Sequence, residues 1–527
     1  MYDDTHEDEW NDAELARAER EDGQLDEVAT GASAWGISIV LHVIAVLVLV
    51  FVVTIERTEP EKAPLRVVTI DAPEKPKVKD TERDLVKKVV PEIDTTEVTD
   101  VPLVTELDLP VTEPEVEADV PSEVKTNGNP DAMAASETGN TGAFMAIGAG
   151  GASAGAFGLR GGGRKYAVGK YGGTKASEGA VDAALEWFAR HQSPNGQWDV
   201  DGYQLNCAAP GTKCEPGTAH TGSDGDVACT AYAVMCFLAG GYDQRTGGRY
   251  RKVVRAGVDW LVSQQAADGS FGKRNYEHPI AVMALAEAYA MTNERPLRKV
   301  VEDGVAVILQ RQAKSPEGYP LGWDYSKPNA ARNDSSVTGW NVMALKAAKA
   351  GGLDVGHGMH GAKRWLEGAW KAANPKWRSI GSDDVSVFPY SWNASTNETK
   401  HDSRVPMGLL SGVFLGLRGG DPMLESMGNY VMAKQVPTSY PTNTYYMYYN
   451  TLAIFQMGGN RWKEWNNVAR DVLVKAQRTG GDCFDGSWDW ENTGFHGHDT
   501  GRLLSTAYCC LSLEVYYRYL PVAAQKH

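Results

Sequence analysis

Positive charge is in short supply in this chain. It holds 52 lysines and arginines against 68 aspartates and glutamates, a formal net charge of −16. Proteins that bind nucleic acid present a basic face to the phosphate backbone, so this balance argues against nucleic acid as a partner. Cysteine is scarce as well: with seven residues, at least one thiol stays unpaired if the others form disulfides.

Long uncharged apolar runs are also rare, and the one at 33–55 stands out. It has 23 residues and contains no Asp, Glu, Lys or Arg, enough to cross a bilayer, which takes about 20 apolar residues. The segment 1–32 before it is acidic and reads as a disordered tail. A cleaved signal peptide would need a basic start and a shorter run. We therefore predict a single transmembrane helix, with the lipid bilayer as a partner.

The segment 56–175 has the composition of a linker. Ten prolines are mixed with charged residues in 56–130, and glycine and alanine dominate 131–175. No helical or strand period survives in 56–130, so we predict an extended, disordered linker there that continues as a flexible segment over 131–175. Aromatic residues and long periodic apolar patterns begin near 176, which places the folded domain at about 176–521.

Two polar residues interrupt the apolar run. Ser38 and His42 lie four positions apart and so share one helix face. The pattern S-x-x-x-H before a Pro/Glu/Lys-rich linker resembles TonB-type energy-coupling proteins. That resemblance implies a proton-channel-type partner, a place in the bacterial inner membrane and a periplasmic folded domain. The alternative is a histidine in a helix-packing contact, and the basic residues flanking the helix slightly favour the reverse orientation.

Two kinds of helix alternate from 179 onward. One kind has a single apolar stripe, as in KVVRAGVDWLVSQQ; the other is apolar nearly all round, as in IAVMALAEAYAMT, and is typical of a buried helix. Six such pairs follow one another, and strand patterns are nearly absent. We predict an all-α fold, an (α/α)6 toroid in which six outer helices surround six inner ones.

A phrase of the form Q-x-x-x-G-x-W/F follows the outer helices. It occurs at Gln192–Trp198 and Gln265–Phe271 and, with insertions, at Gln477–Trp488. It resembles the prenyltransferase and squalene-oxidase repeat family, which includes terpenoid cyclases and protein prenyltransferase β subunits, and is similar to membrane-anchored bacterial members. We expect the glycine to turn the chain, the aromatic residue to pack in the loop and the glutamine to bond helix-end groups.

The catalytic sets of both enzyme classes are incomplete here. In DVACTA (226–231), Asp226 is retained, but Ala228 and Cys229 replace the acids with which cyclases protonate an alkene. In STAYCCLS (505–512), Ser505 stands where the resemblance implies a zinc-binding histidine. We therefore expect a membrane-tethered binding or scaffold module. The alternative is an enzyme that acts on an isoprenoid or glycan substrate through acids and histidines at the toroid rim.

The loops entering the inner helices meet at one rim of a closed toroid. Helix N-termini there tune pKa values, and the catalytic candidates are Asp226, Asp334, His401 and His498. On the inner wall, aromatic side chains could steady carbocations, grip sugars or fill the core; the ligand-lining candidates are Tyr232, Trp340, Tyr446 and Tyr508.

Metal binding is a further hypothesis, since loops one and six become neighbours when the ring closes. The candidate ligands are Cys483, His496 and His498, approached by Cys207, Cys214 and His220. Such residues can hold zinc tetrahedrally, although their spacing matches no standard zinc finger. The alternative is a Cys207–Cys214 disulfide in an oxidising compartment. The remaining cysteines are expected to be core thiols.

Overall fold

The computed structural model describes residues 158–160, 163–207, 213–218, 223–272, 274–329, 331–400, 404–494 and 497–519. The predicted acidic tail, the predicted membrane helix with Ser38 and His42, and the predicted linker as far as residue 157 lie outside these residues. Within them, no helix combines the length and the apolar character that crossing a membrane requires.

The outer helices each bury one side. In the third of them, Leu297, Val301, Val305 and Ile308 are buried at spacings of three and four residues, as expected for a helix with one wet face. The six outer helices are α6 (Lys175–His191), α8 (Arg251–Ser263), α10 (Arg295–Gln310), α12 (Gly358–Ala373), α14 (Pro422–Lys434) and α16 (Gly459–Ala476).

The inner helices are buried on all sides. In the second of them every residue from Glu277 to Thr292 is buried, which matches its apolar sequence. The six inner helices are α7 (Ser223–Ala239), α9 (Glu277–Thr292), α11 (Ser335–Ala350), α13 (Val405–Phe414), α15 (Thr444–Met457) and α18 (Arg502–Leu513). The chain thus alternates between outer and inner helices six times.

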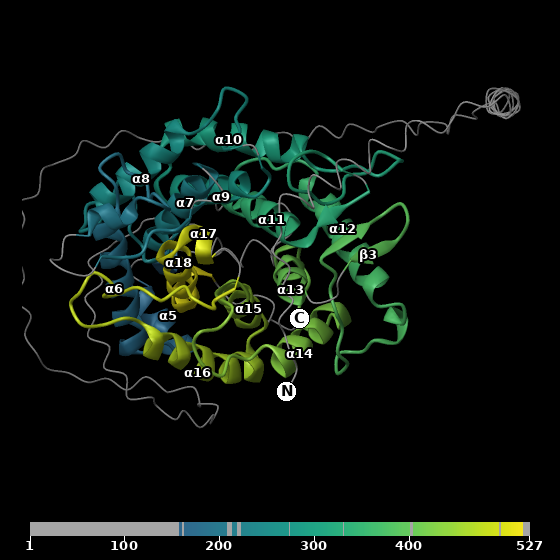
Figure 1. Cartoon of the computed structure of the whole chain (residues 1–527). Coiled ribbons are helices and arrows are strands. Elements are labelled where there is room, and N and C mark those ends of the chain that lie inside the picture. Colours follow the sequence, from purple (N-terminus) through teal and green to yellow (C-terminus); the bar gives the residue numbers. More distant parts are fainter. Residues whose placement is uncertain are drawn as a thin grey trace, which may run out of the picture. The chain divides into compact units, whose positions relative to one another are not determined.

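The inner helices close into a ring. Each packs on the next in chain order, and α18 packs on α7, so the last pair meets the first. The outer helices surround this ring (Figure 1). For the described residues, the prediction of an (α/α)6 toroid is confirmed. We call the contact between the last and first pairs the ring seam.

Where it occurs, the repeated glutamine ties its own loop to the following outer helix. The side-chain amide of Gln192 donates to the carbonyl of Gly196 in its own loop at 2.9 Å and to that of Val253 on α8 at 3.0 Å. Gln265 makes the corresponding pair of bonds, and so does Gln312, whose loop is longer. The acceptors are therefore carbonyls of the loop and of the next outer helix, rather than the end of the preceding one.

The same bond closes the ring seam. Gln477 donates to Gly486 in its own loop and to the carbonyl of Ala180 on α6 at 2.7 Å, 297 positions away in the sequence. Gly486 has φ +91°, a backbone conformation that suits glycine. The glutamine of the last repeat thus bonds to α6 in the way that the other glutamines bond to the outer helix that follows them.

The aromatic residue of the phrase packs beneath the loop, as predicted. The indole N–H groups of Trp198, Trp323 and Trp488 each donate at 2.8 Å to a backbone carbonyl in the last turns of the preceding outer helix. All three tryptophans are fully buried. Each therefore fixes the angle at which the chain leaves the outer helix.

A small antiparallel sheet joins the loops before α11 and α13. Its strands are β1 (Asn333–Asp334), β2 (Ser391–Asn393) and β3 (Glu398–Lys400), in the order β1-β2-β3. Asp334 lies opposite Ser391 in the register. The sheet therefore holds two loops of the rim together.

Three short elements pack together where α18 ends: η1 (Gly158–Arg160), α5 (Arg164–Tyr171) and α19 (Val515–Arg518). Arg160 and Arg518 both bind the carboxylate of Glu287 on α9, at 2.7 and 3.0 Å, and all three side chains are fully buried. The first two elements precede residue 176, where the sequence pattern places the start of the toroid. The remaining short elements are η2 (Tyr203–Asn206), η3 (Trp377–Ser379) and α17 (Gly497–Thr500).

Candidate functional site

The loops that lead into α11 and α13 bring acidic, basic and aromatic side chains together at the rim. The backbone N–H of Ser335 donates to the carbonyl of Tyr390 at 2.9 Å, next to the pairing of β1 with β2. This places the α12–α13 loop against the α10–α11 loop. We call the resulting group the rim cluster; it consists of Asp324, Tyr325, Arg332, Asp334 and Tyr390.

Asp334, a predicted catalytic candidate, caps α11 from a fully buried position. Its Oδ1 accepts from the backbone N–H groups of Ser336 at 2.8 Å and Val337 at 2.9 Å, as the sequence N-D-S-S favours. Its Oδ2 is buried and accepts no hydrogen bond of ordinary geometry among the described residues; Arg332 Nη2 lies 3.9 Å from it, and the carboxylate also interacts with the side chain of Tyr390. A buried carboxylate oxygen in this state is costly, which marks it as a place to look for a ligand.

Asp324 is the second carboxylate of the rim cluster. Its Oδ1 accepts from the backbone N–H of Tyr325 at 2.9 Å and lies 3.6 Å from Arg332 Nη1. Burial raises the pKa of Asp324 to about 6; Arg332 acts in the opposite direction, and Asp334 raises the value further. A carboxyl group with this pKa can both give and take a proton near neutral pH.

Arginines and tyrosines alternate along this part of the rim. The guanidinium of Arg332 lies over the rings of Tyr325 and Tyr390, at 5.4 and 5.7 Å. The guanidinium of Arg404, just before α13, lies over Tyr390 and Tyr446 at 5.3 and 5.9 Å. Such cation–π contacts hold the rings in fixed orientations. Tyr325, Tyr390 and Arg332 thus lie beside the two buried carboxylates, and Arg404 links the ligand-lining candidate Tyr446 to this group.

The other three ligand-lining candidates fill the centre of the ring. Tyr508 donates from its hydroxyl to that of Tyr232 at 3.0 Å, and the rings of Tyr232 and Trp340 lie 5.5 Å apart, edge to face. All three side chains are buried. This is the geometry of a packed aromatic core, and their contact with a ligand stays a prediction.

The remaining catalytic candidates are placed separately. Asp226, on α7, accepts from the backbone N–H of Val200 at 2.9 Å, and burial raises its pKa to about 6. His498 is exposed and contacts Trp490 edge to face at 4.8 Å. His401 lies outside the described residues.

Three thiols and one imidazole converge where the first and sixth loops meet. His191 Nε2 lies 3.3 Å from the sulfur of Cys207, 3.5 Å from that of Cys214 and 3.2 Å from that of Cys483. We call these four residues the thiol–imidazole cluster. It contains the metal-ligand candidate Cys483, whereas the exposed His498 is not part of it and His496 lies outside the described residues. Cys207 and Cys214 are both free thiols.

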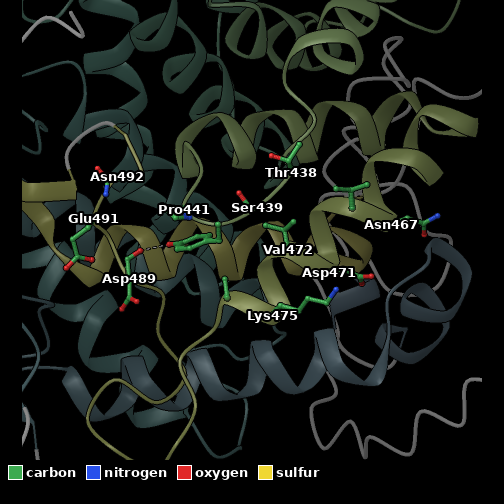
Figure 2. Close-up of a pocket in the computed structure, with 13 residues that line it drawn as sticks. Thr438, Ser439, Pro441, Asn467, Asp471, Val472, Lys475, Asp489, Glu491 and Asn492 are labelled. Atoms are coloured by element: carbon green, nitrogen blue, oxygen red, sulfur yellow. Dashed lines mark hydrogen bonds between the residues drawn. The ribbon is translucent and has the colours of Figure 1, made fainter. Parts of the chain in front are cut away.

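A pocket of about 850 Å³, lined by apolar, polar and charged residues, lies against α16. Figure 2 shows that it lies between α16 and two loops, one with Ser439 and Pro441 and one with Asp489 and Glu491. The hydroxyl of Tyr440, which also lines the pocket, donates to the carbonyl of Asp489. The charged residues that line the pocket include Asp471, Lys475 and Glu491. None of the predicted site residues lines this pocket.

Sequence reasoning missed Asp324, Tyr390 and His191. A signal existed for Asp324, because the pair Trp-Asp recurs at Trp323-Asp324, as it does at residues 198–199 and 488–489. A signal existed for His191 too, since it directly precedes the glutamine of the first repeat phrase. Tyr390 had none, because only the β1–β2 pairing brings it to Asp334.

No protein-family model matches the sequence, and no curated protein matches it. Solved structures do show a likeness. The GH76A α-1,6-mannanase from Salegentibacter sp. HEL1_6 is 12% identical, with 65% of this chain and 98% of that chain covered and a TM-score of 0.44. The cellobiose 2-epimerase from Spirochaeta thermophila DSM 6192 is 10% identical, with 67% of this chain and 97% of that chain covered and a TM-score of 0.46. A D-mannose isomerase is 12% identical, with 65% of this chain and 96% of that chain covered and a TM-score of 0.45.

Likenesses at this level concern the fold and carry over neither substrates nor residue roles. They still correct one expectation. We first expected a non-catalytic binding or scaffold module, but the mannanase, the epimerase and the isomerase are all catalysts that act on sugars. The scaffold expectation is therefore wrong, and the alternative of an enzyme is favoured.

Proposed function

We propose that this chain is an enzyme that acts on a glycan by acid–base chemistry at the rim cluster. The observation that carries the proposal is the pair of buried carboxylates, Asp324 and Asp334, that share Arg332. The pKa of Asp324 is raised, and titratable groups with a perturbed pKa beside a charged partner cluster at active sites. The partly exposed side chains of Tyr325 and Arg332 add a hydroxyl and a guanidinium group that can hydrogen-bond to a sugar.

A glycan fits the site better than an isoprenoid chain does. An isoprenoid would need the apolar centre of the ring, which Tyr232, Trp340 and Tyr508 occupy with contacts to one another. A sugar needs hydrogen-bond partners, which the rim cluster supplies through carboxylates, tyrosine hydroxyls and guanidinium groups. In this scheme Asp324 transfers the proton, Asp334 accepts a hydrogen bond from the substrate through Oδ2, the atom that faces Arg332 at 3.9 Å, and Arg332 holds both carboxylates in place.

Substitution of either carboxylate tests the proposal. The full-length protein is assayed with α-1,6-mannan oligosaccharides, cellobiose and D-mannose for release or isomerisation of sugars. Asp324→Asn and Asp334→Asn are each expected to lower kcat by about 100-fold or more, the usual contribution of a positioned acid or base. The control is Asp259→Asn on outer helix α8, whose side chain is 63% exposed. Absence of turnover on every sugar, or variants as active as the control, contradicts the proposal.

The pH dependence of the activity tests the role of Asp324 separately. The pKa of Asp324 is raised from 3.8 to about 6, so the group keeps its proton below pH 6 and loses it above. Activity that needs the protonated acid should fall as pH rises through about 6. Arg332 lowers this pKa, so Arg332→Gln should move the alkaline limb of kcat to higher pH. The exposed control Arg298→Gln should leave the limb in place; a limb that does not move in Arg332→Gln argues against Asp324 as the acid.

Two finer assignments belong to the same proposal. The chain is a divergent member of the prenyltransferase and squalene-oxidase repeat family; the glutamine bonds of Gln192, Gln265 and Gln477 support this. Residues 33–55 anchor it in the bacterial inner membrane with the toroid in the periplasm, where Ser38 and His42 would face a proton-channel-type partner. Protease added to spheroplasts should then reach the toroid; a protected toroid contradicts this orientation.

A further inference from the structure

We propose that the thiol–imidazole cluster is a structural Zn²⁺ site with Cys207, Cys214, Cys483 and His191 as its four ligands. The four ligand atoms all lie within 4.8 Å of one another. A tetrahedral zinc ion with ordinary bond lengths separates its sulfur and nitrogen ligands by about 3.5–3.8 Å. The observed separations are 3.2–3.5 Å from His191 Nε2 to the sulfurs and 3.5 Å between the sulfurs of Cys214 and Cys483.

The histidine is already oriented as a ligand. His191 Nδ1 lies 2.7 Å from the carbonyl of Trp187, one helical turn earlier, and its ring stacks on the indole of Trp187 at 4.3 Å. A carbonyl can only accept, so Nδ1 carries the proton and Nε2 presents its lone pair to the three sulfurs. Metal-binding histidines are usually fixed in this way by a second hydrogen bond.

Burial raises the pKa of the Cys214 and Cys483 thiols, so three thiolates would form here only when a metal ion binds. Zinc displaces three thiol protons on binding, and three thiolates with one neutral imidazole leave the site with a net charge of −1. Arg190 and Arg502 lie close enough to His191 to act on it electrostatically, and Arg502 is also paired with Glu215 and Asp489. His191, Cys214 and Cys483 are buried, and all four tetrahedral positions come from the protein. A closed set of four protein ligands is typical of a structural rather than a catalytic zinc.

A disulfide explains the cluster less well than a metal does. A Cys207–Cys214 disulfide would not explain why the Cys483 thiol and the lone pair of His191 Nε2 lie at the same point, 3.2 Å apart. Zinc uses all four. Because His191, Cys207 and Cys214 belong to the first repeat and Cys483 to the last, the ion would cross-link the ring seam.

The test is the metal content of the full-length protein, purified without chelator from zinc-supplemented cells and measured by elemental analysis. One zinc per chain is expected, with loss of that zinc in Cys483→Ser and His191→Ala. Cys509→Ser, which removes a buried core thiol outside the cluster, should keep it. A metal-free protein that takes up no zinc, a Cys483→Ser variant that retains zinc, or a disulfide found by mass spectrometry among Cys207, Cys214 and Cys483 would overturn the proposal.

A second measurement applies even where the variants fail to fold. Co²⁺ exchanged into the wild-type protein should show the strong thiolate-to-metal absorption and the visible bands of a tetrahedral site. X-ray absorption of the zinc form should show three sulfur ligands and one nitrogen ligand. An oxygen-rich or six-coordinate spectrum rejects the proposed ligand set. Neither result depends on whether the rim cluster is an active site.

Discussion

Replacing Glu287 with glutamine should lower the free energy of unfolding by about 3–5 kcal/mol, the usual cost of leaving a buried charge without its partner. Glu287 is fully buried between Arg160 and Arg518. Burial acts to raise the pKa of Glu287, but the two arginines outweigh it and the pKa is lowered. The carboxylate is therefore ionised at neutral pH, and Glu287→Gln leaves two buried guanidinium groups uncompensated. Urea denaturation followed by circular dichroism measures the loss.

The matched control is Glu302→Gln. Glu302 pairs with Arg298 on the exposed face of α10, at 2.8 Å with both side chains roughly half exposed. Surface pairs of this kind contribute about 0.5 kcal/mol or less. Since lowering the pH protonates Glu287, the wild type should lose the buried contribution as pH falls through the lowered folded pKa, and Glu287→Gln should not. If Glu287→Gln and Glu302→Gln lowered the free energy of unfolding equally, the buried ion pairs of Glu287 would contribute no more to stability than a surface pair does.

Gly486→Ala should open the ring seam and cost roughly 2–5 kcal/mol, as the sum of a left-handed backbone and an overpacked contact. A Cβ at Gly486 would lie 2.2 Å from the carbonyl oxygen of Ala183 on α6, and the position has φ +91°. The loop would have to move away from α6 and would weaken the bond from Gln477 to Ala180. Thermal unfolding measures the destabilisation, and proteolysis between α16 and α18 reports whether it is confined to the seam.

Gly481 lies in the same loop and supplies the control. Its φ is +74°, but a Cβ there would meet nothing within 4 Å. Gly481→Ala therefore carries only the backbone strain, about 1–2 kcal/mol. The difference between the two alanine variants isolates the contact with α6. If Gly481→Ala and Gly486→Ala are destabilised equally, the close contact between Gly486 and α6 does not contribute to the loss.

Much of the fold could be predicted from the sequence because each repeat carries its own signals. The amphipathic outer helices, the all-round apolar inner helices and the recurring glutamine phrase are local patterns, and together they gave six pairs and a closed ring. The copy of the phrase at Gln312 was missed because its loop is longer. Gly322 and Trp323 follow the glutamine only ten and eleven positions later, so the spacing that identifies the phrase is lost. The sheet was missed because its strands have only two or three residues.

The sites were harder to predict because they depend on contacts between distant loops. Asp334 could be chosen from its place before an inner helix, but its partner Asp324 sits in the middle of a loop, and Tyr390 reaches it only through the β1–β2 pairing. Ring closure correctly suggested that Cys207 and Cys214 would approach Cys483. It did not indicate His191, because the end of an outer helix was not expected to face the first loop.

The long sequence separation across the ring seam has a consequence for synthesis. Gln477 and Ala180 are 297 positions apart. At ribosomal rates of about 5–20 residues per second, roughly 15–60 s pass between the synthesis of α6 and that of its last neighbours. Val181, Leu185 and Phe188 are all buried in the finished ring. During that time their apolar side chains stay partly exposed to solvent. The first helix pair thus waits longest for its neighbours during synthesis, and the last pair to be made completes the ring.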